Sequence, residues 1–322
     1  MVPQLIFGTA SFGMDMTEFQ DVESVKKLLK TLKGLGINHL DSGARYPPLR
    51  PGRSEELIGE AQEISHSFVV DTKVYTNTAN DGSGDLERDA MQISVAGSLQ
   101  RLQRPDGVNV LYAHRADPAT PLEEQVRNFN EQVELGHCKG WGLSNTPPSV
   151  VLEIVDLCEK NGWRKPACYQ GEYSIISRGM ENKLLPILRA HGVAFNAFRS
   201  LASGFLTGKF VNNEPSGTRF SDDNPLSKAM RTVFGSQDLH QAVKDFDTKL
   251  RAYDMSPVEV AIRWVAHHSI LGGDDGIVIG ASKIMQLVET VAAIRKGPLP
   301  EAVLTLIDEL WDAVKETRGE II

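Results

Sequence analysis

Short apolar runs alternate with longer amphipathic segments along the whole chain. The first apolar run, QLIFGTA, spans 4–10, and the segment at 22–36 then repeats apolar residues at helical spacing before it ends in glycines. This order predicts a strand, a loop and a helix, and the next run, INHLD at 37–41, predicts a second strand. The apolar residues on the predicted helix face are Val25, Leu28, Leu29 and Leu32.

The same alternation continues through the chain and predicts eight strands in all. Most strand ends are separated by about 27 to 41 residues, the size of a βα unit, and most runs are apolar on both faces, as a helix-covered parallel sheet requires. We therefore expect an α/β protein with a (β/α)8 TIM barrel, formed as a single domain by residues 1–322. The other predicted strands lie at 67–74, 108–114, 140–144, 167–174, 193–198 and 276–280.

A doubly wound open sheet is the alternative architecture. Its dinucleotide-binding fingerprint, G-x-G-x-x-G, follows none of the predicted strands. The nearest match, GSGDLE at 82–87, lies in a polar loop and lacks the last glycine. The barrel therefore explains the pattern better.

A long insert separates the seventh predicted strand from the last. Between Phe198 and Gly276 the chain has a turn-rich stretch at 212–225 and predicted helices at 238–252 and 256–267. Loops that follow barrel strands lie on the catalytic face, so this insert can cover a pocket. A solvated excursion is equally compatible with the pattern.

Charge and apolar content narrow the classes of function. The 322 residues carry a net charge of -8, and no run of lysine or arginine forms a basic face. Nucleic acid and membrane surfaces are therefore not expected as partners. The first residues lack the pattern of a signal peptide, and no apolar run approaches the ~20 residues that span a bilayer, so we expect a cytoplasmic protein.

Three cysteines, Cys138, Cys158 and Cys168, are odd in number and lack the paired spacing of metal ligands. Neither a disulfide framework nor a metal site is expected from them. At least two of the thiols should be buried and free.

Polar residues stand where three consecutive predicted strands end. Asp41 ends the second strand and Tyr46 follows in the next loop, Lys73 ends the third strand, and His114 ends the fourth. Singly, each has an ordinary explanation as a turn cap, a packing aromatic, a solvated charge or a core histidine. Strand ends converge at one mouth of a barrel, so together these residues favour a functional site.

This set of side chains suits proton transfer to a carbonyl oxygen. A tyrosine with a pKa of about 10 is a poor acid at neutral pH. We expect the Lys73 ammonium to lower the pKa of Tyr46, and Asp41 to keep Lys73 charged and in place, so that Tyr46 serves as general acid. His114 would orient the substrate oxygen. No side chain supplies hydride, so a reduced cofactor is implied.

Several motifs resemble, in order and spacing, those of the aldo-keto reductase superfamily, from about residue 5 to residue 300. The nearest branch contains aflatoxin-aldehyde and succinic-semialdehyde reductases. The resemblance implies a barrel that reduces aldehydes or ketones to alcohols with NADPH, using Asp41, Tyr46, Lys73 and His114 as its tetrad. The motifs are DSGARY, VVDTKVY, LYAHRADPATP, KGWGLSN, YQGEYS, LASGFLTGKF and VIGASKIMQLVETVAAIRKGPLP.

The resemblance also implies a cofactor site in three parts. Phe198 replaces the usual tyrosine that stacks on the nicotinamide ring, a change that stacking tolerates. Thr290 stands where an asparagine commonly faces the adenine. The residues implied for the nicotinamide amide are Ser144, Asn145 and Gln170; for the pyrophosphate loop Gly204, Leu206, Thr207, Gly208 and Lys209; and for the adenosine 2′-phosphate, in a helix start opened by Gly280, Ser282, Lys283 and Gln286.

Several arginines in or near these motifs are candidates for substrate recognition. The loop after Tyr46, PPLRPGR, is longer than the family pattern, and Arg45, Arg115 and Arg219 lie beside or among the family motifs. Arg219 aligns with a carboxylate-binding arginine of the nearest branch. We expect one or more of these arginines to select a carboxylate-bearing or polar carbonyl, although solvated rim charges are the ordinary alternative.

Two other classes of function fit part of the pattern. The β subunits of potassium channels resemble this superfamily and retain the tetrad, but the long N-terminal extension expected for that role is missing. A Schiff-base aldolase would use Lys73 and leave Tyr46 without a purpose. A small-molecule carbonyl is the expected partner, and a homodimer is what the nearest branch implies.

Overall fold

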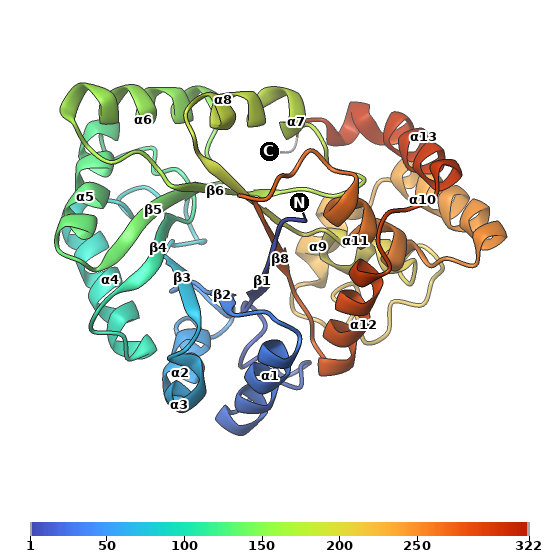
Figure 1. The fold of residues 1–322 in the computed structure, drawn as a ribbon, viewed down its shortest axis with the longest axis horizontal. Helices are drawn as coiled ribbons and strands as arrows, with labels where there is room; N and C mark the ends of the chain where they lie inside the picture. Colours follow the sequence, from blue (N-terminus) through green and yellow to red (C-terminus); the bar gives the residue numbers. More distant parts are fainter. Residues whose placement is uncertain (1, 321–322) are drawn as a thin grey trace.

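The computed structural model describes residues 2–320, in which eight parallel strands close into a barrel (Figure 1). Each strand pairs with the next along the chain, and the last strand pairs with the first through Ile6 and Val278. The predicted (β/α)8 barrel is therefore confirmed. The strands are β1 (Gln4–Gly8), β2 (His39–Asp41), β3 (Val69–Lys73), β4 (Val108–Ala113), β5 (Cys138–Ser144), β6 (Cys168–Glu172), β7 (Ala194–Phe198) and β8 (Gly276–Ile279).

Helices surround the barrel and connect its strands (Figure 1). Since both faces of the sheet are covered, one by helices and one by the barrel interior, the strands are apolar on both sides. Outside the insert the helices are α1 (Val22–Gly34), α2 (Arg53–Glu60), α3 (Gln62–Ser65), α4 (Arg88–Leu102), α5 (Leu122–Glu134), α6 (Pro148–Asn161), α7 (Met180–Lys183), α8 (Leu185–Ala190), α12 (Ile284–Arg295) and α13 (Glu301–Arg318).

Helix α1 shows how local sequence signals produce an element of this fold. Asp21 caps it, because its carboxylate accepts a hydrogen bond of 2.8 Å from the backbone N–H of Ser24. The four predicted apolar residues are its buried residues. The chain leaves the helix at Leu35, and Gly36 follows with φ of 82°, a conformation that glycine adopts without strain.

The insert between β7 and β8 is packed around aromatic side chains. Phe205 stacks on Phe234 with ring centroids 5.2 Å apart, and Phe210 stacks on Phe220 at 4.5 Å. A solvated excursion is therefore excluded. Its elements are η1 (Ala202–Thr207), α9 (Ser227–Phe234), α10 (Gln237–Leu250), η2 (Arg251–Tyr253) and α11 (Pro257–His267).

Helices α10 and α11 confirm the two helices predicted in the insert, whereas α9 was not predicted. Helix α9 has only eight residues and buries just Ser227, Met230 and Phe234, too short a stripe to stand out in the sequence. The last helix, α13, packs against α10 on the outside of the barrel (Figure 1).

All three cysteines are buried and free, as predicted. Burial raises the pKa of the Cys138 and Cys168 thiols to about 12 and that of Cys158 to about 11, so these thiols are unreactive at neutral pH. Within residues 2–320, every helix is too short or too polar to cross a membrane.

Candidate active site

Asp41 and Lys73 form a buried ion pair at the carboxyl ends of β2 and β3. Lys73 Nζ lies 2.6 Å from Asp41 Oδ1 and donates to the carbonyl of Ser42 at 2.7 Å, and the lysine is only 1% exposed. Burial opposes its charged form, but the charge and hydrogen bond of Asp41, together with Tyr46 and Asp71, outweigh that effect and raise the pKa of Lys73. The ammonium therefore stays protonated in spite of its burial.

Tyr46 lies over this ion pair. The Lys73 Nζ atom is 4.9 Å from the centroid of the Tyr46 ring, which meets the His114 ring edge-on at 5.4 Å. Gly43 leaves room for this approach, because a Cβ atom there would lie only 3.3 Å from two carbon atoms of the Tyr46 ring. The four predicted tetrad residues are thus neighbours, at the ends of three consecutive strands.

The pKa of Tyr46 differs from the expectation. Desolvation raises it, and the Lys73 ammonium, which acts in the opposite direction, does not overcome that effect. The negative charge of Asp41 also raises the pKa of Tyr46, because it offsets part of the positive field of Lys73. The predicted lowering of this pKa is therefore wrong for the protein alone.

His114 is neutral at physiological pH. Burial, together with the positive charges of Lys73, Arg115 and Arg45, lowers the pKa of its imidazole to about 3. Its Nδ1 atom is buried and has no hydrogen-bond partner among residues 2–320. A neutral imidazole with one ring nitrogen excluded from solvent can present an N–H at the other nitrogen.

The residues predicted for the nicotinamide amide adjoin the tetrad. Gln170 Nε2 donates to Asp41 Oδ1 at 2.8 Å, which fixes the side-chain amide beside the ion pair. Asn145, with φ of 49°, donates from Nδ2 to the carbonyl of His114 and to Ser144 Oγ. The Asn145 contact to His114 joins the ends of β4 and β5, and the Gln170 contact joins β6 to β2. Amide and hydroxyl groups of this kind fit a carboxamide.

The predicted pyrophosphate loop has an unusual backbone. Positive φ angles occur at Arg199, Ala202, Ser203 and Gly204. The hydroxyl oxygens of Ser200 and Ser203 are buried without a hydrogen-bond partner in the described chain. Unsatisfied hydroxyl groups in a turn of this kind fit a bound anion.

The other residues predicted for this loop differ in exposure. Lys209 is exposed, Gly204 is partly exposed and Gly208 is buried. Leu206 is fully buried in the apolar core, so its side chain is unavailable to a cofactor and only its backbone could take part. Phe198, at the end of β7, is partly exposed, and the Arg199 guanidinium lies 5.6 Å from the centroid of its ring.

The predicted 2′-phosphate residues lie together at the amino end of α12. The backbone N–H groups of Ser282 and Lys283 and the Ser282 hydroxyl all donate to Gln286 Oε1, at 2.9, 3.2 and 3.0 Å. Gly280 is exposed just before them, and Thr290 is partly exposed two turns into the helix. The residues are gathered as predicted, but their donors already have an acceptor within the protein.

Two of the predicted substrate arginines bind neighbouring loops. Arg45 donates to Thr78 Oγ1 at 2.7 Å and also to the carbonyl of Pro48. Arg115 donates to Thr76 Oγ1 at 2.6 Å and to the carbonyl of Asn80 at 3.0 Å. These guanidinium groups hold the loops that follow β2 and β3.

Arg219 is different, because its side chain is open to solvent although many protein atoms surround its guanidinium, and it has no ion-pair or hydrogen-bond partner among residues 2–320. Desolvation and the positive charge of Arg199 lower the pKa of Arg219, while Tyr46 acts in the opposite direction. The two guanidinium groups and the phenol therefore lie within electrostatic reach of one another. An anion between them would relieve the repulsion.

Sequence reasoning missed a buried ion network behind Arg199. Glu172, at the end of β6, accepts from Arg199 at 2.7 Å through one carboxylate oxygen, and through the other from Arg318 and Ser177, each at 2.9 Å. Glu172 is two residues after Gln170 and faces the same side, so its strand position was a usable signal. Arg318 lies 146 residues away in α13, and no local pattern identifies it.

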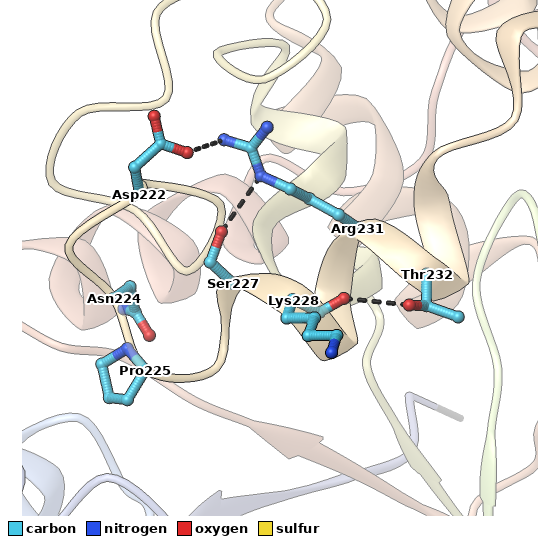
Figure 2. Close-up of a pocket in the computed structure, with 7 residues that line it drawn as sticks. All are labelled: Asp222, Asn224, Pro225, Ser227, Lys228, Arg231 and Thr232. Atoms are coloured by element: carbon cyan, nitrogen blue, oxygen red, sulfur yellow. Dashed lines mark hydrogen bonds and ion pairs between the residues drawn. The ribbon is translucent and has the colours of Figure 1, made fainter.

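An open cavity of about 560 Å³ lies on the insert, and none of the tetrad residues lines it. Most of the residues that line it have polar side chains, and Figure 2 shows Arg231 bonded to Asp222, at 2.8 Å, and to Ser227, at 3.0 Å. Asn224 Nδ2 lies 3.2 Å from the sulfur of Met16, which connects this part of the insert to the loop after β1. The lining residues are Asp222, Asn224, Pro225, Ser227, Lys228, Arg231 and Thr232.

Known proteins resemble this chain over most of its length. Oxidoreductase sirO of Leptosphaeria maculans is 33% identical over 322 residues, with 98% of this chain and 95% of that protein covered. Aflatoxin B1 aldehyde reductase member 2 of Rattus norvegicus is 32% identical, with 97% and 85% covered. An aldo-keto reductase of Pseudocercospora fijiensis is 31% identical, with 89% and 97% covered.

The family comparison agrees with these relatives. The model of the Aldo/keto reductase family matches residues 4–312. This range includes all eight strands and the four residues Asp41, Tyr46, Lys73 and His114. The match covers nearly the whole closed barrel, and the chain therefore belongs to the aldo/keto reductase family.

Proposed function

We propose that this protein reduces aldehydes or ketones to alcohols with NADPH, and that Tyr46 is the general acid. Membership of the family and the reductase relatives make it an oxidoreductase that acts on carbonyl compounds. The observation that carries the finer proposal is the charged Lys73, held by Asp41 and lying 4.9 Å from the Tyr46 ring. When bound, the nicotinamide cofactor supplies the hydride.

The roles of the chain's own residues follow from their charge. Lys73 stays protonated beside Asp41, so it stabilises the phenolate that forms when Tyr46 gives its proton to the carbonyl oxygen. The proton is needed only as negative charge develops on that oxygen, so a raised pKa in the resting protein is compatible with this role. His114, neutral at physiological pH, donates an N–H to the same oxygen and orients the carbonyl.

Three groups of residues fit the cofactor. Gln170, Ser144 and Asn145 would hold the carboxamide beside the tetrad, and the Phe198 ring would stack on the nicotinamide. The unpartnered hydroxyls of Ser200 and Ser203 support a pyrophosphate on the loop that contains Gly204 and Lys209. The amino end of α12, with Ser282 and Lys283, would receive the adenosine end.

For the substrate we propose a carbonyl compound that carries a carboxylate. Arg219 supports this choice, since it has a free guanidinium within electrostatic reach of Tyr46 and Arg199. Arg45 and Arg115 are already bound to neighbouring loops, so we propose that they shape the mouth without contacting the carboxylate. A charge-assisted pair between Arg219 and the substrate would orient the carbonyl toward Tyr46.

The proposal is tested with Tyr46→Phe, which removes only the acidic hydroxyl. NADPH oxidation with succinic semialdehyde and with aromatic aldehydes should fall by at least about 1,000-fold, a loss typical of a general acid. Binding of NADPH, followed by quenching of protein fluorescence, should change less than about threefold. Substantial residual turnover would remove Tyr46 from the acid role. Tight NADPH binding by the wild-type protein with no turnover of any aldehyde or ketone would favour a cofactor-binding regulatory protein.

A further inference from the structure

The amino end of α12 is closed by a carboxylate of the protein itself. Three donors there bind Gln286 Oε1, and the next one, the backbone N–H of Ile284, donates to Glu18 Oε2 at 2.9 Å. The first N–H groups of a helix form the positive end of its dipole and attract anions. Glu18 therefore occupies, with its negative charge, the place where an adenosine 2′-phosphate would bind.

Glu18 is held in this position by its backbone. Its N–H donates to the carbonyl of Ser282 at 2.8 Å, so the loop between β1 and α1 and the start of α12 are joined by hydrogen bonds in both directions. The hydroxyl of Thr17 binds the carbonyl of Met14 at 3.0 Å, and Ser11 Oγ binds the carbonyl of Ala281 at 3.1 Å. The carboxylate is thus part of a docked loop.

We infer that Glu18 selects the cofactor, by weakening the preference for NADPH over NADH. This inference rests on the proposed function, because it requires a dinucleotide whose adenosine end lies at α12. A 2′-phosphate carries between one and two negative charges at neutral pH, and it competes with the Glu18 carboxylate for the N–H group of Ile284 and is repelled by that carboxylate. The 2′-hydroxyl of NADH is neutral and donates a hydrogen bond to a carboxylate, as ribose hydroxyls do in other dinucleotide sites.

The experiment compares dissociation constants of NADPH and NADH for the wild-type protein and Glu18→Gln, by quenching of protein fluorescence. Glutamine keeps an oxygen that can accept from the Ile284 N–H but removes the charge. The dissociation constant of NADPH should fall about tenfold, as expected from the loss of one like charge at a solvated site, and that of NADH should stay equal or rise. Glu18→Ala should change the ratio in the same direction.

Asp15→Asn is the matched control. Asp15 lies in the same loop and is exposed, and its backbone carbonyl, which the substitution keeps, accepts from Gln20 at 2.8 Å. The variant removes the same charge without touching α12, so it should leave the NADPH to NADH ratio within about twofold. If Asp15→Asn changes the ratio of the NADPH and NADH dissociation constants as much as Glu18→Gln does, the total negative charge of the loop is responsible, and the assignment to Glu18 is overturned.

Binding of cofactor fragments tests the role of Glu18 separately from the proposed function. 2′,5′-ADP and 5′-AMP carry only the adenosine end, so the Glu18→Gln variant should bind 2′,5′-ADP about tenfold more tightly than the wild type, with 5′-AMP unchanged. If the wild type binds both dinucleotides and the Glu18→Gln variant keeps the wild-type preference between NADPH and NADH, only the role of Glu18 is overturned and the proposed function stands. Failure of the wild type to bind either dinucleotide overturns the proposed function and, with it, this inference.

Discussion

Lys73 keeps a full positive charge where almost no water reaches it. The cost of burying that ammonium is offset by Asp41 at 2.6 Å and by the carbonyl of Ser42 at 2.7 Å. Burial raises the pKa of Tyr46, and the Asp41 carboxylate adds to this effect because it offsets part of the influence of Lys73. At the scale of single residues, the site holds a proton donor that becomes useful only when a carbonyl oxygen develops charge beside it.

Arg219 provides the prediction at this scale. Arg219→Ala should lower kcat/KM for succinic semialdehyde by about 10- to 100-fold, the worth of a charge-assisted hydrogen bond, and should leave an uncharged aldehyde of similar length nearly unchanged. Steady-state NADPH oxidation with both substrates measures the ratio.

Arg53→Ala is the control for a lost positive charge, because Arg53 is paired with Glu56 and Glu60 at the start of α2. Its preference ratio should equal that of the wild type. If Arg219→Ala also leaves the ratio unchanged, Arg219 does not recognise the carboxylate.

At the scale of elements, the last helix supports the mouth of the barrel. Arg318 of α13 is 4% exposed and donates to Glu172 and to Ser177. Glu172 in turn holds the guanidinium of Arg199, which follows the predicted stacking residue Phe198 and has a φ of 58°. Helix α13 is therefore coupled to the residues that flank the predicted nicotinamide position.

Arg318→Met should lower the free energy of unfolding by about 1–3 kcal/mol, because Glu172 loses one of its two cationic partners while Arg199 remains. Urea denaturation measures this change. If α13 also positions Arg199, KM for a carboxylate-bearing aldehyde should rise with little change in kcat.

Lys315→Met, one turn earlier in α13, is the matched control. Lys315 pairs with Asp312 at 2.9 Å in an exposed position, where solvent screening leaves such a pair little effect on stability. Equal effects of the two substitutions on stability and on KM would show that Arg318 contributes no more than an exposed charge.

At the scale of the whole molecule, the pairing of β2 with β3 in the barrel brings together another buried pair, His39 and Asp71, on the amino-terminal side of Asp41 and Lys73. His39 Nε2 lies 2.9 Å from Asp71 Oδ2, and both residues are buried. Asp71 also accepts from Asn109 Nδ2 at 2.8 Å. Burial opposes the imidazolium, but Asp71 and the charge of Asp41 outweigh it and raise the pKa of His39.

This raised pKa predicts a pH-dependent contribution to stability. A group with a pKa that is higher in the folded state contributes fully below its unfolded pKa, about 6.5 for histidine, and loses that contribution as the pH rises through the folded value. The difference in free energy of unfolding between the wild type and His39→Gln should therefore be largest near pH 6 and should shrink at higher pH. Urea denaturation across pH 6–9 measures it, and a difference independent of pH would exclude a charged His39.

Much of the fold and of the site was predictable from local patterns. Alternating apolar runs identified all eight strands, because burial on both faces marks a strand within its own few residues. Asp41, Lys73 and His114 stood at or next to strand ends, and in a barrel those ends meet whatever the details of packing. The short helix α9 escaped notice, since its few buried residues serve the aromatic cluster of the insert.

The sequence by itself determined the strand and helix order, the barrel and the identity of the residues gathered at its mouth. Only the tertiary structure decided which further partners contact each charged group: Arg318 contacts Glu172, the start of α12 contacts Glu18, and Gln170 contacts Asp41. Periodicity is a local property of the chain, whereas a pKa or an ion pair depends on distances of a few ångström and on water exclusion. Those quantities exist only once the chain has folded.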